Sequence, residues 1–387
     1  MKDNLDTNKI KIGVVGAGSW GTALADLLGS KGFKVDFWVY ETHVKEQIIE
    51  YGENKMFLPG FSLSPNLHPS NNLAKVVSDK DLVLIVVPSH VMRQTTQQIS
   101  SHVSKDTIVV SASKGIENKT HLTMSGVFKE TLPEISENLF AALSGPSFAK
   151  EVVKKVPTVV TVASNQPETA GFVQRVFATP FFRVYTSDDM TGVELGGSVK
   201  NVIAIAAGIV DGLGLGLNTR AALITRGLTE IRRLGLEMGA NPRTFTGLAG
   251  VGDLILTCTG GLSRNHTVGK KIGEGMKLRE ILSEMHMVAE GVKTSKSVYN
   301  LSRKLDVEMP ISHEMYHILY DDLSPKEALH RLMTRDLKNE LDELRWRRRT
   351  PHLLRCSGFL SRRCLAGVYR TFYLAICDTF YETVRFR

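Results

Sequence analysis

Short apolar runs alternate with amphipathic stretches from the N-terminus to about Ala163. The apolar runs predict buried strands, and the stretches between them have helical spacing. Strands that alternate with helices are typical of a parallel sheet covered on both faces, and right-handed crossovers then favour a doubly wound α/β fold. The expected strands are Ile10–Gly16, Lys34–Tyr40, Leu82–Val87, Thr107–Ala112, Phe140–Leu143 and Thr158–Ala163, and the first expected helix is Trp20–Lys31.

From about Asp188 the strand-like runs disappear and helical patterns follow one another. The expected helices are Met190–Gly212, Ala221–Met238, Pro242–Thr257, Arg264–Glu274, Glu290–Leu305, Ser312–Tyr320 and Ser324–Asp336. In the last of these, Ser324 is a good N-cap because a proline follows it at the first helical position. We therefore predict a doubly wound domain over residues 9–188, an all-helical domain over 189–344 and a separate tail over 345–387.

Composition places the chain among ordinary globular proteins. Of its 387 residues, 42% are apolar and 23% are charged, which excludes wholesale disorder, collagen and coiled coil. The longest clean apolar run, Val202 to Val210, is much shorter than the roughly 20 residues of a membrane-spanning helix. The polar start, Met1 to Lys11, does not resemble a secretory signal, so we expect a cytoplasmic protein.

The net charge of +8 belongs entirely to the tail. Residues 345–387 hold ten arginines, no lysine and two acids, while the remainder carries as many acidic as basic residues. The body therefore gives no indication of a nucleic-acid partner. Only Cys258 lies in the body, and the tail cysteines have no zinc-site spacing.

A glycine-rich turn, Gly16-Ala17-Gly18-Ser19-Trp20-Gly21, follows the first expected strand and opens the first expected helix. In this GxGxxG pattern Gly16 allows the tight turn, Gly18 lets the backbone approach a pyrophosphate, and Gly21 lets the helix pack close to the strand. The helix N-terminus then favours an anion. We predict dinucleotide binding here; the alternative is a tight turn without a ligand.

The choice between NAD and NADP stays open. Glu41 follows the second expected strand, where an acid usually binds a ribose hydroxyl and favours NAD, although it lies one residue late. Lys45 is one helical turn further on, and no arginine stands ready for a 2′-phosphate. The sequence leans slightly to NAD, and Glu41 is equally well explained as a solvated helix acid.

Several spaced motifs together resemble the NAD(P)-dependent glycerol-3-phosphate dehydrogenases of the bacterial, biosynthetic type. The motifs are GAGSWG from Gly16, SKGI from Ser113, LSGPSFA from Leu143, GGSVKNVIA from Gly196, GLAGVGD from Gly247, SRN from Ser263 and EGV from Glu290. The resemblance runs from about Lys9 to Leu344. It implies a Rossmann domain, a helical domain, a site between them and a homodimer. It also implies reversible conversion of dihydroxyacetone phosphate to sn-glycerol 3-phosphate, for phospholipid synthesis.

Lys200 is the expected general acid/base. It lies on a strongly apolar helical segment, and partial desolvation should lower its pKa towards working pH. The family assigns this lysine the proton transfer. From the residues alone, a lysine that packs its stem and extends its head to solvent is an equal alternative.

The resemblance places further groups around Lys200. Lys114, after the fourth strand, becomes a catalytic, substrate-binding and cofactor-contacting cation, although a surface lysine is the plainer interpretation. Asn201 and Asp253 should orient the amine and contact substrate hydroxyls, with Asp253 counted as catalytic, and Thr257 lies one turn beyond Asp253.

A phosphate and a dinucleotide need their own contacts. Arg264 and Asn265 open a helix, which suits a phosphate dianion, and we expect Ser263 beside them in substrate binding. Other expected substrate contacts are Gly145 and Ser147. Other expected cofactor contacts are Ser19, Trp20, Tyr40, Ala149, Arg264, Val288 and Glu290.

One rival interpretation lies within the oxidoreductases, and another belongs to a different class of protein. The β-hydroxyacid dehydrogenases carry asparagine one turn after the catalytic lysine, whereas Asn201 is adjacent to Lys200. A non-catalytic dinucleotide sensor would not need Lys114, Lys200, Asp253 and Arg264 together. No HExxH motif and no G-x-S-x-G elbow are present, so we expect no metal and no serine hydrolase.

The tail over 345–387 has eight aromatic residues among its arginines. The abrupt change in composition favours an extension translated from an unselected reading frame. Contact with an anionic membrane or a partner is the less favoured alternative.

Overall fold

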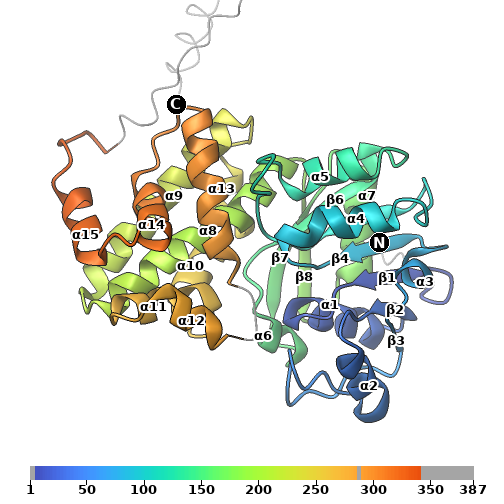
Figure 1. Cartoon of the computed structure of the whole chain (residues 1–387). Coiled ribbons are helices and arrows are strands. Elements are labelled where there is room, and N and C mark those ends of the chain that lie inside the picture. Colours follow the sequence, from blue (N-terminus) through green and yellow to red (C-terminus); the bar gives the residue numbers. More distant parts are fainter. Residues whose placement is uncertain (1–4, 286–288, 341–387) are drawn as a thin grey trace, which may run out of the picture. The chain divides into compact units, whose positions relative to one another are not determined.

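The computed structural model describes residues 5–285 and 289–340. An eight-stranded sheet forms the first half, in the order β3-β2-β1-β4-β5-β6-β7-β8 (Figure 1). The strands are β1 (Ile12–Val15), β2 (Val35–Trp38), β3 (Leu67–Ser70), β4 (Leu82–Ile85), β5 (Ile108–Ser111), β6 (Phe140–Ser144), β7 (Thr158–Ala163) and β8 (Phe182–Ser187). Strand order reverses between β1 and β4, as in a Rossmann-type doubly wound sheet.

Helices connect the strands and then fill the second half of the described chain (Figure 1). The sheet half contains α1 (Ser19–Ser30), α2 (Thr42–Tyr51), α3 (Leu73–Val77), α4 (Met92–Ile99), α5 (Met124–Thr131), α6 (Ala149–Val153) and α7 (Pro167–Phe177), with short turns η1 (Ser89–Val91) and η2 (Glu137–Leu139). The helical half contains η3 (Thr244–Thr246), η4 (Leu248–Gly252), α8 (Met190–Gly212), α9 (Gly216–Glu237), α10 (Asp253–Thr259), α11 (Arg264–Gly273), α12 (Leu278–Ser283), α13 (Glu290–Lys304), α14 (Pro310–Tyr320) and α15 (Pro325–Met333). The α/β class with a helical second half is thus as predicted.

The sheet differs from the expectation in three respects. β3 was not predicted because Leu67–Ser70 is short, polar and contains a proline, which only an edge strand tolerates. β8, at the other edge, was also missed; its exposed Arg183 and Tyr185 alternate with buried residues. The expectation of parallel strands fails at β6 and β7, which pair antiparallel. Every other pairing in the sheet is parallel.

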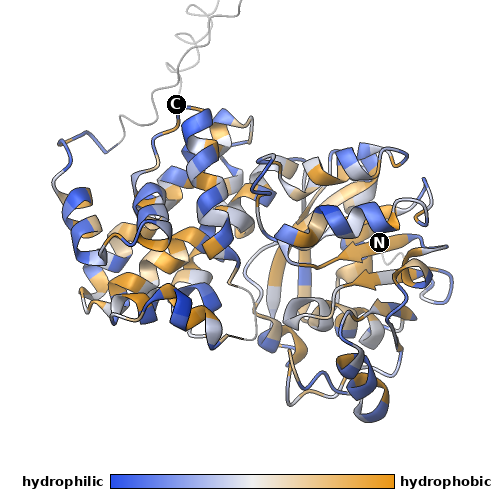
Figure 2. Ribbon diagram, in the orientation of Figure 1, coloured by the Kyte–Doolittle hydropathy of each residue, from blue (hydrophilic) through white to orange (hydrophobic). Residues whose placement is uncertain are grey.

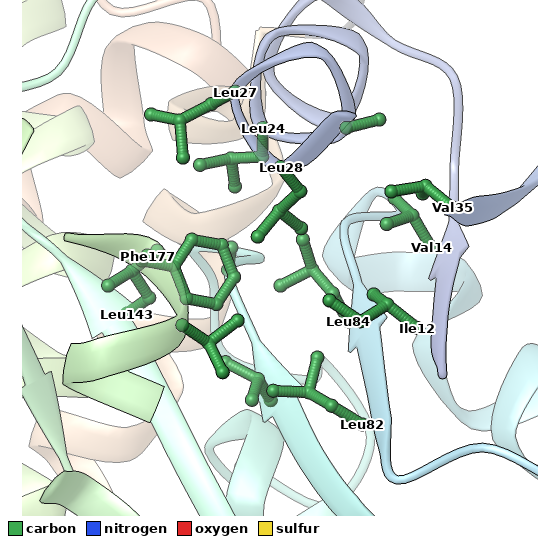
Figure 3. Packing of buried hydrophobic residues seen from close by; sticks show 14 of the residues in the cluster. Ile12, Val14, Leu24, Leu27, Leu28, Val35, Leu82, Leu84, Leu143 and Phe177 are labelled. Carbon is green, nitrogen blue, oxygen red and sulfur yellow. The ribbon is translucent and has the colours of Figure 1, made fainter. Parts of the chain in front are cut away.

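Two apolar layers cover the sheet. On one face, Leu24 and Leu28 of α1 and Phe177 of α7 pack against Val14 and Leu84 of the central strands (Figure 3). On the other face, residues of α3, α4, α5 and the start of α8 pack against β1, β4 and β5. The strands are buried on both faces, which explains their continuous apolar sequences.

α8 is the central element of the helical half. It is long and apolar enough to cross a membrane by composition, but 94% of that window is buried inside the protein, as in the core helix of a globular domain. Hydrophobic residues, orange in Figure 2, accordingly concentrate on the strands and on the inner helices. Asp189 caps the helix by accepting from the Gly192 amide at 2.9 Å, so the change from sheet to helices falls at this point.

The pattern predicts one helix over Pro242–Thr257, and the structure differs. The segment divides into η3, η4 and α10 because Gly250 has a non-helical backbone (φ −102°, ψ −105°). The break has a consequence for the site, since it makes Asp253 the first residue of α10 rather than an interior one.

Candidate active site

The glycine-rich turn joins β1 to α1. Gly16 has φ +115°, and a side chain there would lie 2.6 Å from the Val86 carbonyl oxygen. A Cβ on Gly21 would lie 1.9 Å from the Gly16 carbonyl oxygen, so helix and strand could not pack with any larger residue. Gly18, in contrast, has nothing within 4 Å of a Cβ position, and no side chain caps the helix that it starts.

This turn fits a dinucleotide. The open face over Gly18 admits a pyrophosphate to the start of α1. Ser19 donates from its hydroxyl to the Phe57 carbonyl at 2.5 Å, which ties the turn to the segment after α2. The buried indole nitrogen of Trp20 has no hydrogen-bond partner among the described residues.

The groups expected to select between NAD and NADP are close to solvent. Tyr40 is 75% exposed, and its ring meets Trp38 edge-on at 5.8 Å between centroids. β2 ends at Trp38, and Glu41 is the N-cap residue of α2 without a side-chain capping bond. The geometry is compatible with either cofactor.

Lys200, Asp253 and Thr257 form one buried cluster, and the half-buried Lys114 joins it. The Lys200 Nζ lies 2.5 Å from Asp253 Oδ1 and 2.8 Å from the Thr257 hydroxyl. The Lys114 Nζ lies 2.7 Å from the other oxygen, Asp253 Oδ2. Asp253 is 1% exposed and Lys200 is 5% exposed, so their contact is shielded from bulk water, whereas the Lys114 side chain is 18% exposed.

Burial and charge oppose each other in this cluster. Burial lowers the pKa of Lys200 to about 8; Asp253 acts to raise it, and Lys114 lowers it further. Burial alone would raise the pKa of Asp253, but Lys114 and Lys200 offset this and hold that pKa below its usual value. Asp253 therefore stays ionised while Lys200 can exchange a proton near neutral pH.

Lys114 and the 145–149 loop come from the carboxyl ends of neighbouring strands. Lys114 follows β5, and its Nζ also donates to the Gly145 carbonyl at 3.2 Å. Gly145 follows β6 with φ +147°, and the Ser147 hydroxyl donates to the Gly145 carbonyl at 3.1 Å. Ala149 begins α6 directly afterwards. Ligands of doubly wound sheets bind at this edge.

The N-terminus of α11 lies beside α8. Ser263 caps α11 by accepting from the His266 amide at 3.2 Å. Asn265 donates from Nδ2 to Asn201 Oδ1 at 3.0 Å, which places the predicted phosphate-binding residues next to the residue that follows Lys200. Arg264 is half-buried; burial lowers the pKa of its guanidinium, and the charge of Glu290 acts in the opposite direction.

Glu290, at the start of α13, contacts the sheet half. Its carboxylate accepts from the Ser89 amide at 3.2 Å and from the Ser89 hydroxyl at 2.6 Å. Sequence reasoning did not select Ser89; its one signal is a Pro-Ser pair directly after a buried strand. The predicted contact Val288 lies outside the described residues. Within residues 5–285 and 289–340 no cluster of three metal-ligating side chains occurs.

The fold and the cluster together define a class: a Rossmann-type dehydrogenase whose helical half supplies a lysine to the edge of the sheet. Comparison with known proteins gives the particular family. The models of the N-terminal and C-terminal regions of NAD-dependent glycerol-3-phosphate dehydrogenase match residues 11–170 and 189–330. The chain belongs to this family and is an NAD(P)-dependent oxidoreductase.

Individual relatives agree over nearly their whole length. Glycerol-3-phosphate dehydrogenase [NAD(P)+] of Syntrophobacter fumaroxidans is 54% identical over 86% of this chain and 97% of the relative. The enzyme of the same name from Citrifermentans bemidjiense is 56% identical over 85% of this chain and 98% of the relative. The crystal structure of the dehydrogenase from Coxiella burnetii has 40% identity and a TM-score of 0.81, over 84% of this chain and 99% of that one.

Proposed function

We propose that this protein carries out its family's reaction, the reversible reduction of dihydroxyacetone phosphate to sn-glycerol 3-phosphate, with Lys200 as the general acid/base. The nicotinamide supplies the hydride for reduction and accepts it in the reverse direction. The observation that supports the proposal best is the buried contact of Lys200 with Asp253, which orients the amine, while burial brings its pKa to about 8.

The surplus charge of the cluster suits the chemistry. Negative charge develops on the ketone oxygen during reduction, and a nearby cation or proton donor lowers the barrier. Lys200 donates the proton, and Lys114 remains as a second cation that polarises the carbonyl. Asp253 holds both ammonium groups, and the Thr257 hydroxyl accepts from Lys200 and so helps to orient its amine. Asn201 instead accepts from Asn265, which ties the start of α11 to α8.

The substrate phosphate binds at the start of α11. Arg264 offers a planar set of donors, and Asn265 stands next to it on a helix N-terminus. The Ser263 hydroxyl accepts from the His266 amide and can still donate its own proton to a phosphate oxygen. We expect Gly145 and Ser147, which follow β6, to contact the substrate as well.

The remaining assignments follow from the family. The turn from Gly16 to Gly21 binds the pyrophosphate of NAD or NADP, with Tyr40, Ala149 and Glu290 as further contacts. We place the enzyme in the cytoplasm, at the entry to phospholipid synthesis, and we expect a homodimer; sedimentation of the purified chain tests that expectation.

Lys200→Ala tests the central assignment. We expect kcat for reduction to fall by roughly 10²–10⁴, the usual contribution of general acid catalysis, while the Kd for NADH changes little. Lys114→Ala should lower kcat less, because it removes polarisation but leaves the proton donor. A Lys200→Ala enzyme with near-normal kcat would reject the mechanism.

Arg264→Ala tests the phosphate site. The KM for dihydroxyacetone phosphate should rise roughly 10–100-fold, because a charged hydrogen bond contributes about 1.5–3 kcal/mol. Arg264→Lys should recover only part of this, since an ammonium does not present two parallel donors. An unchanged KM in both variants would place the phosphate elsewhere.

A further inference from the structure

The contact between Ser89 and Glu290 joins residues 201 positions apart in the sequence. Ser89 lies in the segment that follows β4, and Glu290 is the first residue of α13. Both oxygens of the carboxylate are engaged, one by the Ser89 amide and one by its hydroxyl. A carboxylate fixed by two donors of one residue has little freedom to turn.

This contact lies at the point where strand order reverses. β4 and β2 flank β1, and the segment after β4 touches the glycine-rich turn, because a Cβ on Gly16 would be 2.6 Å from the Val86 carbonyl oxygen. Dinucleotides bind in the crevice at such a reversal. Ser89, three residues after Val86, therefore stands beside the crevice and not on a remote surface.

The loop that carries Lys114 closes over the same contact. A Cβ on Gly115 would be 2.3 Å from the Ser89 hydroxyl oxygen and 3.5 Å from Glu290 Oε2. Only glycine allows this approach, so the loops after β4 and β5 and the start of α13 meet at one place. A shift of Ser89 would thus displace both Glu290 and Gly115, the residue next to Lys114.

Glu290 is half-buried, so water reaches its carboxylate less easily than an exposed one and the bonds from Ser89 matter more. Burial raises the pKa of Glu290, while the two bonds from Ser89 and the charges of Lys293 and Arg264 act in the opposite direction. Removing a donor from a buried carboxylate costs more than the bond itself, since water cannot replace it.

We propose that Ser89 is a positioning residue for cofactor binding: it holds the Glu290 carboxylate at the crevice and so keeps the start of α13 against the sheet where the nicotinamide nucleotide binds. The inference rests on the proposed function, in which Glu290 contacts the cofactor. Ser89 itself need not touch the cofactor, and its hydroxyl acts through Glu290.

Ser89→Ala tests this inference through the Kd for NADH and NADPH, measured by calorimetry on the full chain without substrate. We expect Kd to rise about tenfold, the effect of losing one hydrogen bond to a charged group. Ser125→Ala is the matched control, because the Ser125 amide and hydroxyl hold buried Glu194 in the same way, at 2.8 Å and 2.5 Å. Ser125→Ala should lower the melting temperature about as much as Ser89→Ala does, and it should leave the Kd for NADH and NADPH within twofold. An unchanged Kd in Ser89→Ala, or an equal rise in Ser125→Ala, would overturn the inference.

A double-mutant cycle separates positioning from direct contact. In a Glu290→Ala background, Ser89→Ala should change Kd less than twofold, because its effect passes through the carboxylate. Full additivity of the two changes would refute the positioning role. These binding measurements do not involve Lys200, so failure of the inference is distinguishable from failure of the proposed function, which the kcat of Lys200→Ala reports.

Discussion

Asp253 receives two ammonium groups on one nearly inaccessible carboxylate, an arrangement that stability alone does not explain. Buried ion pairs seldom stabilise a fold more than apolar residues of the same size. Here one acid faces two bases, Lys114 and Lys200, so the cluster keeps a surplus positive charge. A surplus cation in a dry place has most value when a negative charge develops next to it, as on the ketone oxygen.

The pKa of Lys200 predicts opposite pH profiles for the two directions. Reduction uses the ammonium form, so its kcat/KM should fall as pH rises above about 8. Oxidation of sn-glycerol 3-phosphate uses the free amine, so its kcat/KM should rise about tenfold per pH unit below about 8 and then level off. Initial rates in both directions between pH 6 and 10 measure this.

Asp253→Asn provides the directional control for that experiment. The Asp253 charge raises the pKa of Lys200, so its removal should move the oxidation profile to lower pH. A shift to higher pH, or a flat profile in the parent enzyme, would assign the titration to another group.

Part of this site could be predicted from the sequence. The apolar neighbours of Lys200 lie on one helix, so the local pattern indicates partial desolvation, but it allows a head group extended to solvent equally well. The pairing with Asp253 came from the family resemblance, since 53 residues separate the two. Ser89 and Glu290 are even further apart in the sequence, and Ser89 belongs to no motif. Their contact can therefore be seen only in the folded structure.

At the scale of elements, three glutamates act as caps for helices to which they do not belong; Glu194 and Glu230 are buried, and Glu290 is half-buried. Glu194 accepts from Ser125 at the start of α5, and Glu290 accepts from Ser89 at the start of η1. Glu230 accepts from the Ile311 and Ser312 amides at the start of α14. None of these three helices has a capping side chain of its own at the N-cap position. Tertiary contacts thus satisfy the amides that local sequence leaves open.

The packing of α11 on α8 predicts a strong effect of a single methyl group. A Cβ on Gly269 would lie 1.9 Å from the Ile205 carbonyl oxygen, which is backbone and cannot move aside cheaply. Gly269→Ala should therefore destabilise the protein by about 1–3 kcal/mol or more. It should also raise the KM for dihydroxyacetone phosphate, because α11 presents Arg264. Denaturant unfolding and steady-state kinetics measure the two effects.

Gly171→Ala is the matched control for that change. Gly171 is also helical, in α7, but a Cβ there meets only the tip of the Arg175 side chain at 3.5 Å. The alanine should leave KM unchanged and increase stability by up to about 1 kcal/mol, since it improves helix propensity. Equal behaviour of the two variants would show that the α8–α11 contact is not tight.

The elements that the pattern failed to predict share a physical cause. Apolar periodicity predicts where a chain is buried, and it locates α8 to the residue. It does not report the backbone angles at Gly250, which end one helix and start α10 at Asp253. It also overlooks β3 and β8, because edge strands need few buried residues.

For the whole molecule, polar bonds join the sheet half and the helical half beside the apolar packing of Met190 and Val193 against the sheet. Lys114 reaches Asp253, Ser125 reaches Glu194, Ser89 reaches Glu290, and the Ser297 hydroxyl donates to the Ile116 carbonyl at 2.8 Å. The halves belong to one compact unit that extends to Arg335.

Removal of residues 345–387 tests whether the enzyme needs its basic tail. The family models end at residue 330, and a relative matched over 331 residues is covered to 97% of its length, so the chemistry lies within the part that remains. A chain that ends at Leu344 should keep kcat and both KM values within twofold. Because the whole +8 charge lies beyond that point, its pI should fall well below 9.2. Flotation with anionic liposomes gives the second measurement, and we expect neither form to float. Flotation of the full chain alone, abolished by salt, would instead assign the arginines and aromatic residues to a membrane surface.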